Sequence, residues 1–593
     1  MGKITLVLSS NIEDLKNNVI KMIDLKSARE NVVIVPDRFS LLSELAIFNQ
    51  HKTSSVFNTN VMPISRLATS LLEKIGKKID IVTKEEEGFL IRRSIQKTSH
   101  LFKVLPQTTS VGLCEEVAST IAQLKANKVA VENLKNTQFG QFLQDKLDDI
   151  MLIYAEYETL LGEKADSGRI LEVFDQNIEK IAFLQNMNLF FVGFDSFTTQ
   201  IFELIKKLKK YVPQIVVGAF YHFNSNNKKV FELDVYEKFN TFKKEEGFEI
   251  IETASTLPAV FDFAHKNVLS RSKENLEINE EIKLFSYENP KQEIEFTLKE
   301  IASLIKEEGL RYSDFAIATQ NLERQKNALE LALKKFDLSY YLDTSYSFSK
   351  TPLGEFVLSF LNLILKQFDK NALKGFLGSI FVGLSFNERA EMFNLLDKYL
   401  TFYNDLKTLE KVVVSQDREV YQKFRKYFLK FNAYREKLFK AKTIFDFVNF
   451  INEFLEDFEV EKVCEVNALK LSAEGQLKEE KIFLQLYSKC TQSLNSLNAY
   501  LQDEEVSADE FYDLLKNSFE SKKVSTVPMS GDCIFVGETT TSFFPKVKHL
   551  FVLGTSYSSV PQKLEDKGIL NDKNLEEMER EIKVFSGIAK RLR

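Results

Sequence analysis

Apolar segments typical of buried strands occur in two groups along this chain, and a long stretch with helical periodicity interrupts each group. The first group comprises residues 3–8, 31–35, 54–61, 188–193 and 214–221. These short runs alternate with amphipathic helices, which is the pattern of a doubly wound parallel sheet. Between its two halves, residues 84–184 show helical spacing of apolar residues throughout. The interruption therefore predicts a helical insertion within one sheet-containing core.

The second group repeats this plan. Its strand-like segments are residues 281–286, 314–319, 533–537 and 549–554. We therefore expect an α/β fold with two parallel-sheet cores, each carrying a large α-helical insertion. The expected parts are core 1 (1–80 and 186–280) with insertion 81–185, and core 2 (281–350 and 525–593) with insertion 351–524. Because the last predicted helix, 574–593, reaches the final residue without a terminating loop, we expect core 2 to be truncated.

Composition agrees with long helices and excludes several classes of protein. Gly (21 of 593 residues) and Pro (10) reach half or less of their usual shares of about 7% and 5%. So few chain breakers argue against β-rich repeats and Pro-rich linkers. With 79 Lys and Arg against 85 Asp and Glu, the net charge is −6. Such a chain cannot coat nucleic acid by bulk charge, so any binding to nucleic acid requires local basic patches.

The cysteine and histidine pattern predicts no metal or cofactor in this chain. The four cysteines are single and far apart, and the five histidines show no paired ligand spacing. The acidic runs 85–87 and 148–149 are interpreted as charges on helices rather than as a catalytic acid–base pair. The first residues do not form a signal peptide, and no run of about 18 apolar residues occurs. We expect a cytoplasmic protein with no membrane span.

The turn after the first predicted strand lacks the residues of a working ATP site. A phosphate-binding loop needs glycines and a lysine in the pattern G-x-x-x-x-G-K-[ST], but residues 9–14 read SSNIED. A motor also needs an acidic pair at a later strand end to hold Mg²⁺. There the chain has Gly193, Phe194 and a single Asp195. We predict that core 1 does not hydrolyse ATP.

Loops at the carboxyl ends of the strands carry candidate DNA-binding side chains, because ligands of parallel sheets bind at that edge. In single-strand sites, cations pair with phosphates and aromatic rings stack on bases. The candidates are Arg38, Phe39, Ser65, Arg66, Phe194 and Phe197 in core 1, and Thr539 and Thr540 in core 2. The alternative roles are core packing for the aromatic residues, a helix salt bridge for Arg66 and a capped turn for the threonines.

Seven segments follow one another in order along nearly the whole chain. They are VVIVPDRFSLLSE (32–44), ISRLA (64–68), LFFVGFDSFTTQ (189–200), YENPKQEIEFTLKEIASLIKEEGLRYSDFAIATQN (287–321), YYLDTSYSFSKTPLGEFV (340–357), IFVGETTTSFFPKVKHLFVLGTSYSSVP (534–561) and GILNDKNLEEMER (568–580). Each segment alone is mostly an apolar strand and a turn. The ordered set is specific, and it resembles the AddB/RexB family, the B-type subunits of ATP-dependent helicase/deoxyribonucleases.

The resemblance implies two helicase-like cores on the superfamily 1 plan. It implies a heterodimer with a motor–nuclease subunit of the AddA/RexA type, where ATP and Mg²⁺ act. It also implies binding of single-stranded DNA and of double-stranded DNA with a broken end. Members of the family carry a C-terminal nuclease domain with an iron–sulfur cluster, to which no segment here corresponds. They read a recombination-hotspot sequence in single-stranded DNA with the region of core 1.

The residues and the resemblance together indicate a non-motor, DNA-strand-binding subunit of an AddAB/RexAB-type helicase–nuclease. Such a complex processes double-strand breaks for homologous recombination, with scanning for a hotspot as a further role of this subunit. One alternative is an ATP-dependent helicase or translocase active in its own right, which the missing lysine disfavours. The other is a protein-binding helical scaffold, which the strand–turn pattern of both cores disfavours.

Overall fold

The computed structural model describes most of the 593-residue chain. The residues outside the description are 1, 10, 37–39, 53–56, 136, 195–196, 221–238, 240–241, 243–246, 254–255, 268–280, 345, 367–369, 400–409, 525–530, 543, 557–558, 561–567 and 583–593. Two predicted DNA-binding residues, Arg38 and Phe39, therefore lie outside the described residues, as does Asp195.

Six strands form the first sheet, in the order β3-β2-β4-β5-β1-β6, and all neighbours are parallel. Their bounds are β1 (Lys3–Ser9), β2 (Glu30–Ile34), β3 (Thr59–Met62), β4 (Met187–Phe191), β5 (Gln214–Phe220) and β6 (Phe248–Glu252). All five residues of β4 are buried, because both faces of a parallel sheet are covered. β1 and β4 share this sheet, which confirms that the chain returns to the first core after the helical stretch.

Helices cover both faces of the first sheet. The helices of the first half are α1 (Ile12–Lys21), α2 (Ser40–His51), α3 (Ile64–Lys74), α4 (Lys84–Thr98), α5 (Val111–Ala126), α6 (Val131–Lys135), α7 (Gln141–Leu161), α8 (Ser167–Asn177), α9 (Thr199–Leu208) and α11 (Ala259–Asn267). α1 and α2 pack on the face that carries Val7 and Phe190. α3, α8 and α9 pack on the opposite face, which carries Leu6 and Phe191. Neighbouring residues of one apolar strand thus supply two separate cores.

The second sheet has four strands, in the order β12-β7-β11-β8, and is also parallel. The strands of the second half are β7 (Phe315–Thr319), β8 (Tyr340–Leu342), β9 (Tyr346–Ser347), β10 (Lys523–Val524), β11 (Ile534–Glu538) and β12 (His549–Leu553), of which β9 and β10 form a small antiparallel pair. The pairing of β7 with β12 confirms the return of the chain to this core. The two parallel sheets and their helical insertions confirm the predicted α/β class.

One strand prediction in the second core is wrong. Residues 281–286 form no strand, although their apolar side chains alternate with polar ones. Leu284 is 91% exposed and Phe285 is 54% exposed. Apolar periodicity yields a strand when a neighbouring strand supplies hydrogen-bond partners, and this segment pairs with none of the described strands.

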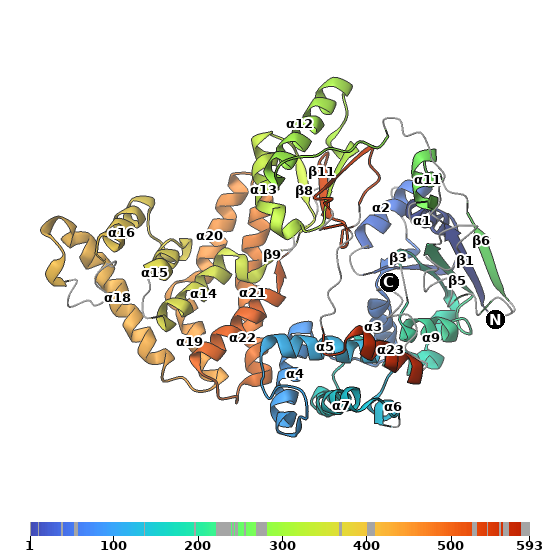
Figure 1. The fold of residues 1–593 in the computed structure, drawn as a ribbon, viewed down its shortest axis with the longest axis horizontal. Coiled ribbons are helices and arrows are strands. Elements are labelled where there is room, and N and C mark those ends of the chain that lie inside the picture. The colour runs from blue at the N-terminus through green and yellow to red at the C-terminus, as the bar shows by residue number, and fades with distance from the viewer. Residues whose placement is uncertain are drawn as a thin grey trace.

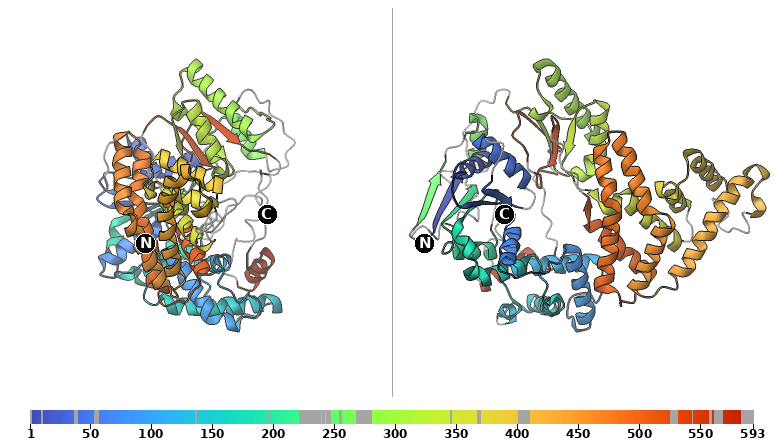
Figure 2. Two further views of the ribbon diagram at one scale, coloured as in Figure 1. Left: turned by 90° about the vertical axis from the view of Figure 1, so that its left-hand side faces the viewer. Right: turned by 180° about the vertical axis from the view of Figure 1, so that it is seen from behind.

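Helices dominate the second half of the chain. They are α12 (Pro290–Glu308), α13 (Leu322–Lys335), α14 (Pro352–Leu365), α15 (Lys370–Leu377), α16 (Phe386–Tyr399), α18 (Arg418–Leu438), α19 (Ile444–Asp457), α20 (Val460–Ala473), α21 (Leu477–Leu501), α22 (Ala508–Ser521) and α23 (Asp572–Glu581). α12 and α13 pack on the second sheet. α14 to α22 form a helical block around a phenylalanine-rich core. This second block projects away from the first sheet (Figure 1; Figure 2, right).

The first helical block, α4 to α7, packs against the second, although the sequence places the two insertions in different cores. Glu85 of α4 forms an ion pair with Lys522, with Nζ and Oε2 2.6 Å apart. Arg92 of α4 forms a second ion pair with Glu504, whose Oε1 lies 3.0 Å from the guanidinium Nη2. Phe89, also on α4, belongs to the core of the second block. Helix α4 therefore joins the two blocks through two buried charged side chains and one buried aromatic side chain.

The last described helix lies on the first helical block, although the sequence assigns its residues to core 2. Ile569, Leu575 and Met578 are buried in the apolar core of the first block. The Gly140 amide donates a hydrogen bond to Glu577 at 2.6 Å. α23 accordingly lies beside the helices at the bottom of Figure 1. The position of α23 depends on an apolar surface formed by residues more than 400 positions earlier in the chain. Local sequence patterns do not reveal such a contact.

Candidate functional site

The start of α1, where a motor of this fold would hold phosphates, is closed by a carboxylate. The Asn11 side chain caps the helix by accepting a hydrogen bond from the Glu13 amide at 3.0 Å. Asp14 is 9% exposed and accepts hydrogen bonds from the amide and hydroxyl of Thr256 at 2.7 and 2.6 Å. The Asn11 amide group donates to the same carboxylate at 2.9 Å. A negative charge, fixed by three donors, thus stands in the first turn of the helix and repels phosphate.

The strand end after β4 holds two phenylalanines of different character. Phe197 is 2% exposed and contacts Phe191 and Phe239, with ring centroids 5.8 and 5.9 Å apart. Apolar core side chains surround the Phe197 ring in this structure, so it has no exposed face on which a base could stack. Phe194 is half-buried and stacks on Phe197 at 5.0 Å. Phe194 therefore remains a candidate for base stacking.

Ser65 and Arg66 lie in the first turn of α3, directly after β3. Pro63 precedes the helix in an extended conformation, as its fixed φ allows. Arg66 is exposed, and no carboxylate of the described residues forms an ion pair with it. It lines an open groove of about 370 Å³ between α2 and the edge strand β3, together with Glu44, Ile47, Phe48, Thr59, Asn60, Val61 and Met62. The alternative role of a helix salt bridge is not observed among the described residues.

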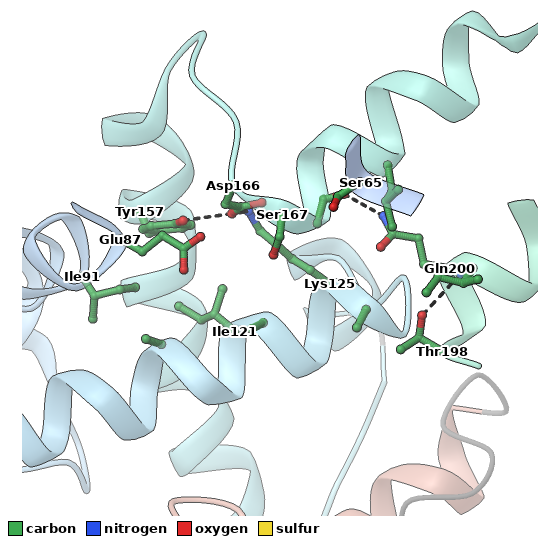
Figure 3. Close-up of a pocket in the computed structure, with 16 residues that line it drawn as sticks. Ser65, Glu87, Ile91, Ile121, Lys125, Tyr157, Asp166, Ser167, Thr198 and Gln200 are labelled. Atoms are coloured by element: carbon green, nitrogen blue, oxygen red, sulfur yellow. Dashed lines mark hydrogen bonds and ion pairs between the residues drawn. The ribbon is translucent and has the colours of Figure 1, made fainter. Parts of the chain in front are cut away.

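Ser65 points to a different space, a cavity of about 200 Å³ between the first core and the first helical block (Figure 3). Its lining comes from α3, α4, α5, α7, α8 and α9, and we call it the Glu87 cavity after the carboxyl that points into it (Figure 3). Its lining residues are Ser65, Glu87, Ile91, Ala118, Ile121, Ala122, Lys125, Ala126, Tyr157, Asp166, Ser167, Gly168, Leu171, Thr198, Gln200 and Ile201. The cavity is therefore apolar on the α5 side and polar at the helix starts.

A network of hydrogen bonds and ion pairs fixes the polar wall of the Glu87 cavity. Asp166 forms an ion pair with Lys125 and accepts hydrogen bonds from the Tyr157 hydroxyl at 2.9 Å and the Arg169 amide at 2.8 Å. Burial alone would raise the pKa of Asp166, but Lys125 and these donors hold it below its usual value. Lys125 also forms an ion pair with Glu158. Both charges are thus satisfied within the protein.

Glu87 differs from these neighbours. Burial and the nearby Asp166 carboxylate raise the pKa of Glu87 to about 7, although Lys125, Lys84 and the Ser167 amide favour its ionised form. From the sequence, Glu87 is interpreted as part of an acidic run on a helix. The sequence pattern does not predict the cavity. Residues 87, 125, 157 and 166 come from four elements, so no local motif signals their meeting.

The two threonines predicted as phosphate contacts lie in a tight turn after β11. Thr540 donates its hydroxyl to Glu538 at 3.2 Å, and the Thr539 amide donates to the Thr319 carbonyl at 2.9 Å. The Ser542 hydroxyl accepts from the Glu538 amide at 2.8 Å. These contacts fit the capped-turn alternative for Thr540. Both threonines are exposed and belong to the second core, whereas Ser65, Arg66 and Phe194 belong to the first.

The described residues do not fit a metal cluster. They contain no group of three or more His, Cys, Asp or Glu side chains placed to hold a metal ion. Cys114, Cys464 and Cys490 are buried, and burial raises the pKa of Cys114 to about 11 and that of Cys464 to about 12. Among the described residues, none of the helices has the length and apolar character needed to cross a membrane.

Comparison with known proteins supports the resemblance seen in the sequence. Residues 14–269 match the family described as "ADDB, N-terminal". Proteins named as the B-type subunit of an ATP-dependent helicase/deoxyribonuclease match most of the chain: 24% identity in Alkaliphilus metalliredigens (94% of this chain, 51% of the relative), 24% in Listeria monocytogenes (97% and 52%) and 22% in Bacillus thuringiensis (99% and 54%). Over residues 14–269, and at lower identity over most of its length, the chain is similar to the AddB family of helicase/deoxyribonuclease subunits. It spans about half the length of the curated relatives it matches.

Proposed function

We propose that this chain is a non-motor subunit of the AddB type that holds one DNA strand for a helicase–nuclease. In this role it pairs with a motor–nuclease subunit of the AddA/RexA type, which supplies ATP and Mg²⁺. The complex takes in double-stranded DNA at a broken end, in the cytoplasm, and processes the break for homologous recombination. Scanning the single strand for a hotspot sequence is part of the same proposal.

Arg66 and its groove are the observation that carries this proposal. The guanidinium is exposed and lies at the carboxyl end of a parallel strand, where ligands of such sheets bind. With a net charge of −6, the chain repels DNA at long range, so a bound strand needs local cations of this kind. The half-buried ring of Phe194, two strands away in the same sheet edge, adds an aromatic surface for a base.

The start of α1 favours a non-motor role over an active helicase. Phosphate binding at a helix start needs free amides and a nearby lysine. Here the first turn carries Glu13 and Asp14, and Asp14 is held in place by Thr256. The names of the relatives support the partner, because each is called a subunit of a helicase/deoxyribonuclease.

A salt titration of single-strand binding tests the proposal. Wild type and Arg66→Ala are titrated with a labelled dT oligonucleotide at several salt concentrations, and affinity is read by fluorescence anisotropy. Loss of one phosphate contact is expected to weaken binding and to lower the slope of log affinity against log salt by about 0.7. Arg580→Ala is the matched control, because Arg580 is an exposed arginine on α23. If Arg66→Ala keeps wild-type affinity and slope, the groove is not the binding path.

A further inference from the structure

The chain crosses between the second sheet and the second helical block twice, and both crossings meet in one joint. The first crossing follows β9, and the second joins the end of α22 to β10. β9 pairs with β10, and the Phe348 amide donates to the Lys522 carbonyl at 2.8 Å. Phe348 also packs edge-to-face on Phe519, with ring centroids 4.7 Å apart, and both rings are fully buried. We call residues 346–351 and 518–524 the joint, because these two segments connect the second block to the second sheet.

Helix α4, which belongs to the first helical block, contacts this joint. Glu85 in its first turn pairs with Lys522 at 2.6 Å and accepts a hydrogen bond from the Ser518 hydroxyl. The Glu85 side chain is only 5% exposed, so these two partners replace water around the carboxylate. A capping box fixes the start of the helix, since the Thr83 amide donates to the Glu86 carboxylate at 2.7 Å. The helix that follows core 1 in the chain therefore reaches the connection between core 2 and its insertion.

The contact continues along one face of α4. Phe89 and Arg92 follow Glu85 after four and seven residues, so the three side chains lie on the same side of the helix. Phe89 enters the apolar core of the second block. The Arg92 guanidinium pairs with Glu504 at 3.0 Å, and the two side chains are 9% and 11% exposed. The face is thus charged at both ends and apolar between them.

The other face of α4 holds the helix in the first block. Leu90, Ile91 and Ile95 are buried there in the apolar core that α4 shares with α5 and α7. Because of these contacts, α4 cannot follow the second block without leaving its own. Separation of the two blocks would instead leave the Glu85 and Arg92 charges without their partners, which is strongly unfavourable for groups that are removed from water.

We propose that α4 is a clamp that holds the two cores at a fixed distance, so that this chain forms a rigid frame. Core 1 leads into α4 through residues 75–83, and core 2 is connected to the joint. Movement of one core relative to the other therefore has to break the ion pairs of Glu85 and Arg92. The ribbon shows α4 beside α21 and α22, between the first core and the second block (Figure 1). This inference goes beyond the proposed function, because a non-motor subunit that holds DNA does not require a fixed spacing of its cores.

Single-molecule fluorescence energy transfer between the cores tests the clamp. Dyes are attached to Lys21→Cys on α1 and Lys306→Cys on α12, two exposed positions. The background is Cys533→Ser, because the other three cysteines are buried. With the native α4, the labelled chain should give one narrow distribution of transfer efficiency, both without DNA and with a single-stranded dT oligonucleotide.

Removal of the two charges on α4 should release the clamp. Glu85→Ala/Arg92→Ala leaves the two partners in the second block unpaired. The ratio of separated to closed molecules should then rise by about a hundredfold or more, and a second population or a broad distribution should appear. Lys97→Ala is the matched control, because it removes an exposed ion pair between α4 and α7 within the first block. This control should keep the narrow distribution.

A charge exchange separates loss of the clamp from loss of folding. Lys522→Glu places a second carboxylate beside Glu85 and should broaden the distribution, whereas Glu85→Lys/Lys522→Glu restores opposite charges and should make it narrow again. Circular dichroism checks that each variant is as helical as wild type. A broad distribution in wild type, a narrow one in Glu85→Ala/Arg92→Ala, or a charge exchange that stays broad would overturn the proposal. None of these results bears on strand binding, which the titration of Arg66→Ala tests by itself.

Discussion

Two strand ends of the first sheet, those of β1 and β3, lie at the same edge because all six strands are parallel. Each leads into a helix, yet the two helix starts differ in what they offer a ligand. At α1, the Asp14 carboxylate is engaged by Thr256 and closes the first turn. At α3, Arg66 is exposed beside an open groove. The comparison teaches that one fold can present a fixed negative charge at one strand end and an exposed positive charge at another.

The largest expected effect is a loss of stability at a third strand end, that of β4, where one aromatic residue is buried and another is half-buried. Phe197→Ala removes a ring from the core and should lower the free energy of unfolding by about 3–5 kcal/mol, measured by chemical denaturation. Phe194→Ala should cost less, because that ring is half-buried. Equal losses of stability in the two variants would contradict the assignment of Phe197 to the core and of Phe194 to the candidate site.

A smaller effect is expected at the closed start of α1. Asp14→Ala removes a buried carboxylate with three hydrogen bonds and should lower the free energy of unfolding by about 1.5–3 kcal/mol. Glu13→Ala, in the same turn, is the matched control and should cost less than about 1 kcal/mol, because Glu13 forms a local, part-exposed ion pair with Lys16. If Asp14→Ala is as stable as wild type, the carboxylate does not hold this helix start in place.

ATP turnover is a separate check on the closed helix start. Neither wild type nor Asp14→Ala should hydrolyse ATP, because residues 9–14 lack the glycines and the lysine that bind phosphates. The measurement is phosphate release with and without single-stranded DNA. A DNA-stimulated rate of about 1 s⁻¹ or more from the purified chain would place it among active enzymes and overturn the non-motor role.

A further effect is a pH dependence of stability at the Glu87 cavity. In the folded chain the pKa of Glu87 is raised to about 7, so the folded state binds a proton more tightly than the unfolded state. Stability from this group is therefore lost as the pH rises from its ordinary value of 4.5 towards 7. Glu87→Gln cannot ionise, so it should gain stability relative to wild type over this range. A constant difference between pH 5 and pH 8 would contradict the raised pKa.

Sequence patterns predict the parts of this molecule that depend on neighbouring residues. Continuous apolar runs predict the central strands β1, β4 and β7, because burial on both faces leaves no room for polar residues. The absence of a phosphate-binding loop can also be predicted, because the residues of such a loop are close together in the sequence. The unpaired segment 281–286 is mispredicted, because pairing depends on a strand that the segment itself does not specify.

Contacts between distant segments account for the other differences. Phe194 and Phe197 look equivalent in the sequence, but only Phe197 is fully buried, and one of the rings packed on it is Phe239, more than 40 residues later. The Glu87 cavity joins six helices, and the position of α23 on the first block depends on residues such as Gly140. No local motif carries this information, so the candidate site is half predicted: Ser65, Arg66 and Phe194 come from the sequence, and Glu87 comes from the structure.

Cross-linking tests most directly whether a DNA strand binds at the open strand end rather than at the closed one. A single-stranded oligonucleotide with 5-iodouracil is bound to the chain, irradiated and digested, and the cross-linked peptides are identified by mass spectrometry. We expect cross-links in the peptides that contain the groove residues Phe48 and Arg66, and their loss in Arg66→Ala. Cross-links confined to the peptide that begins α1, around Asp14, would contradict the account.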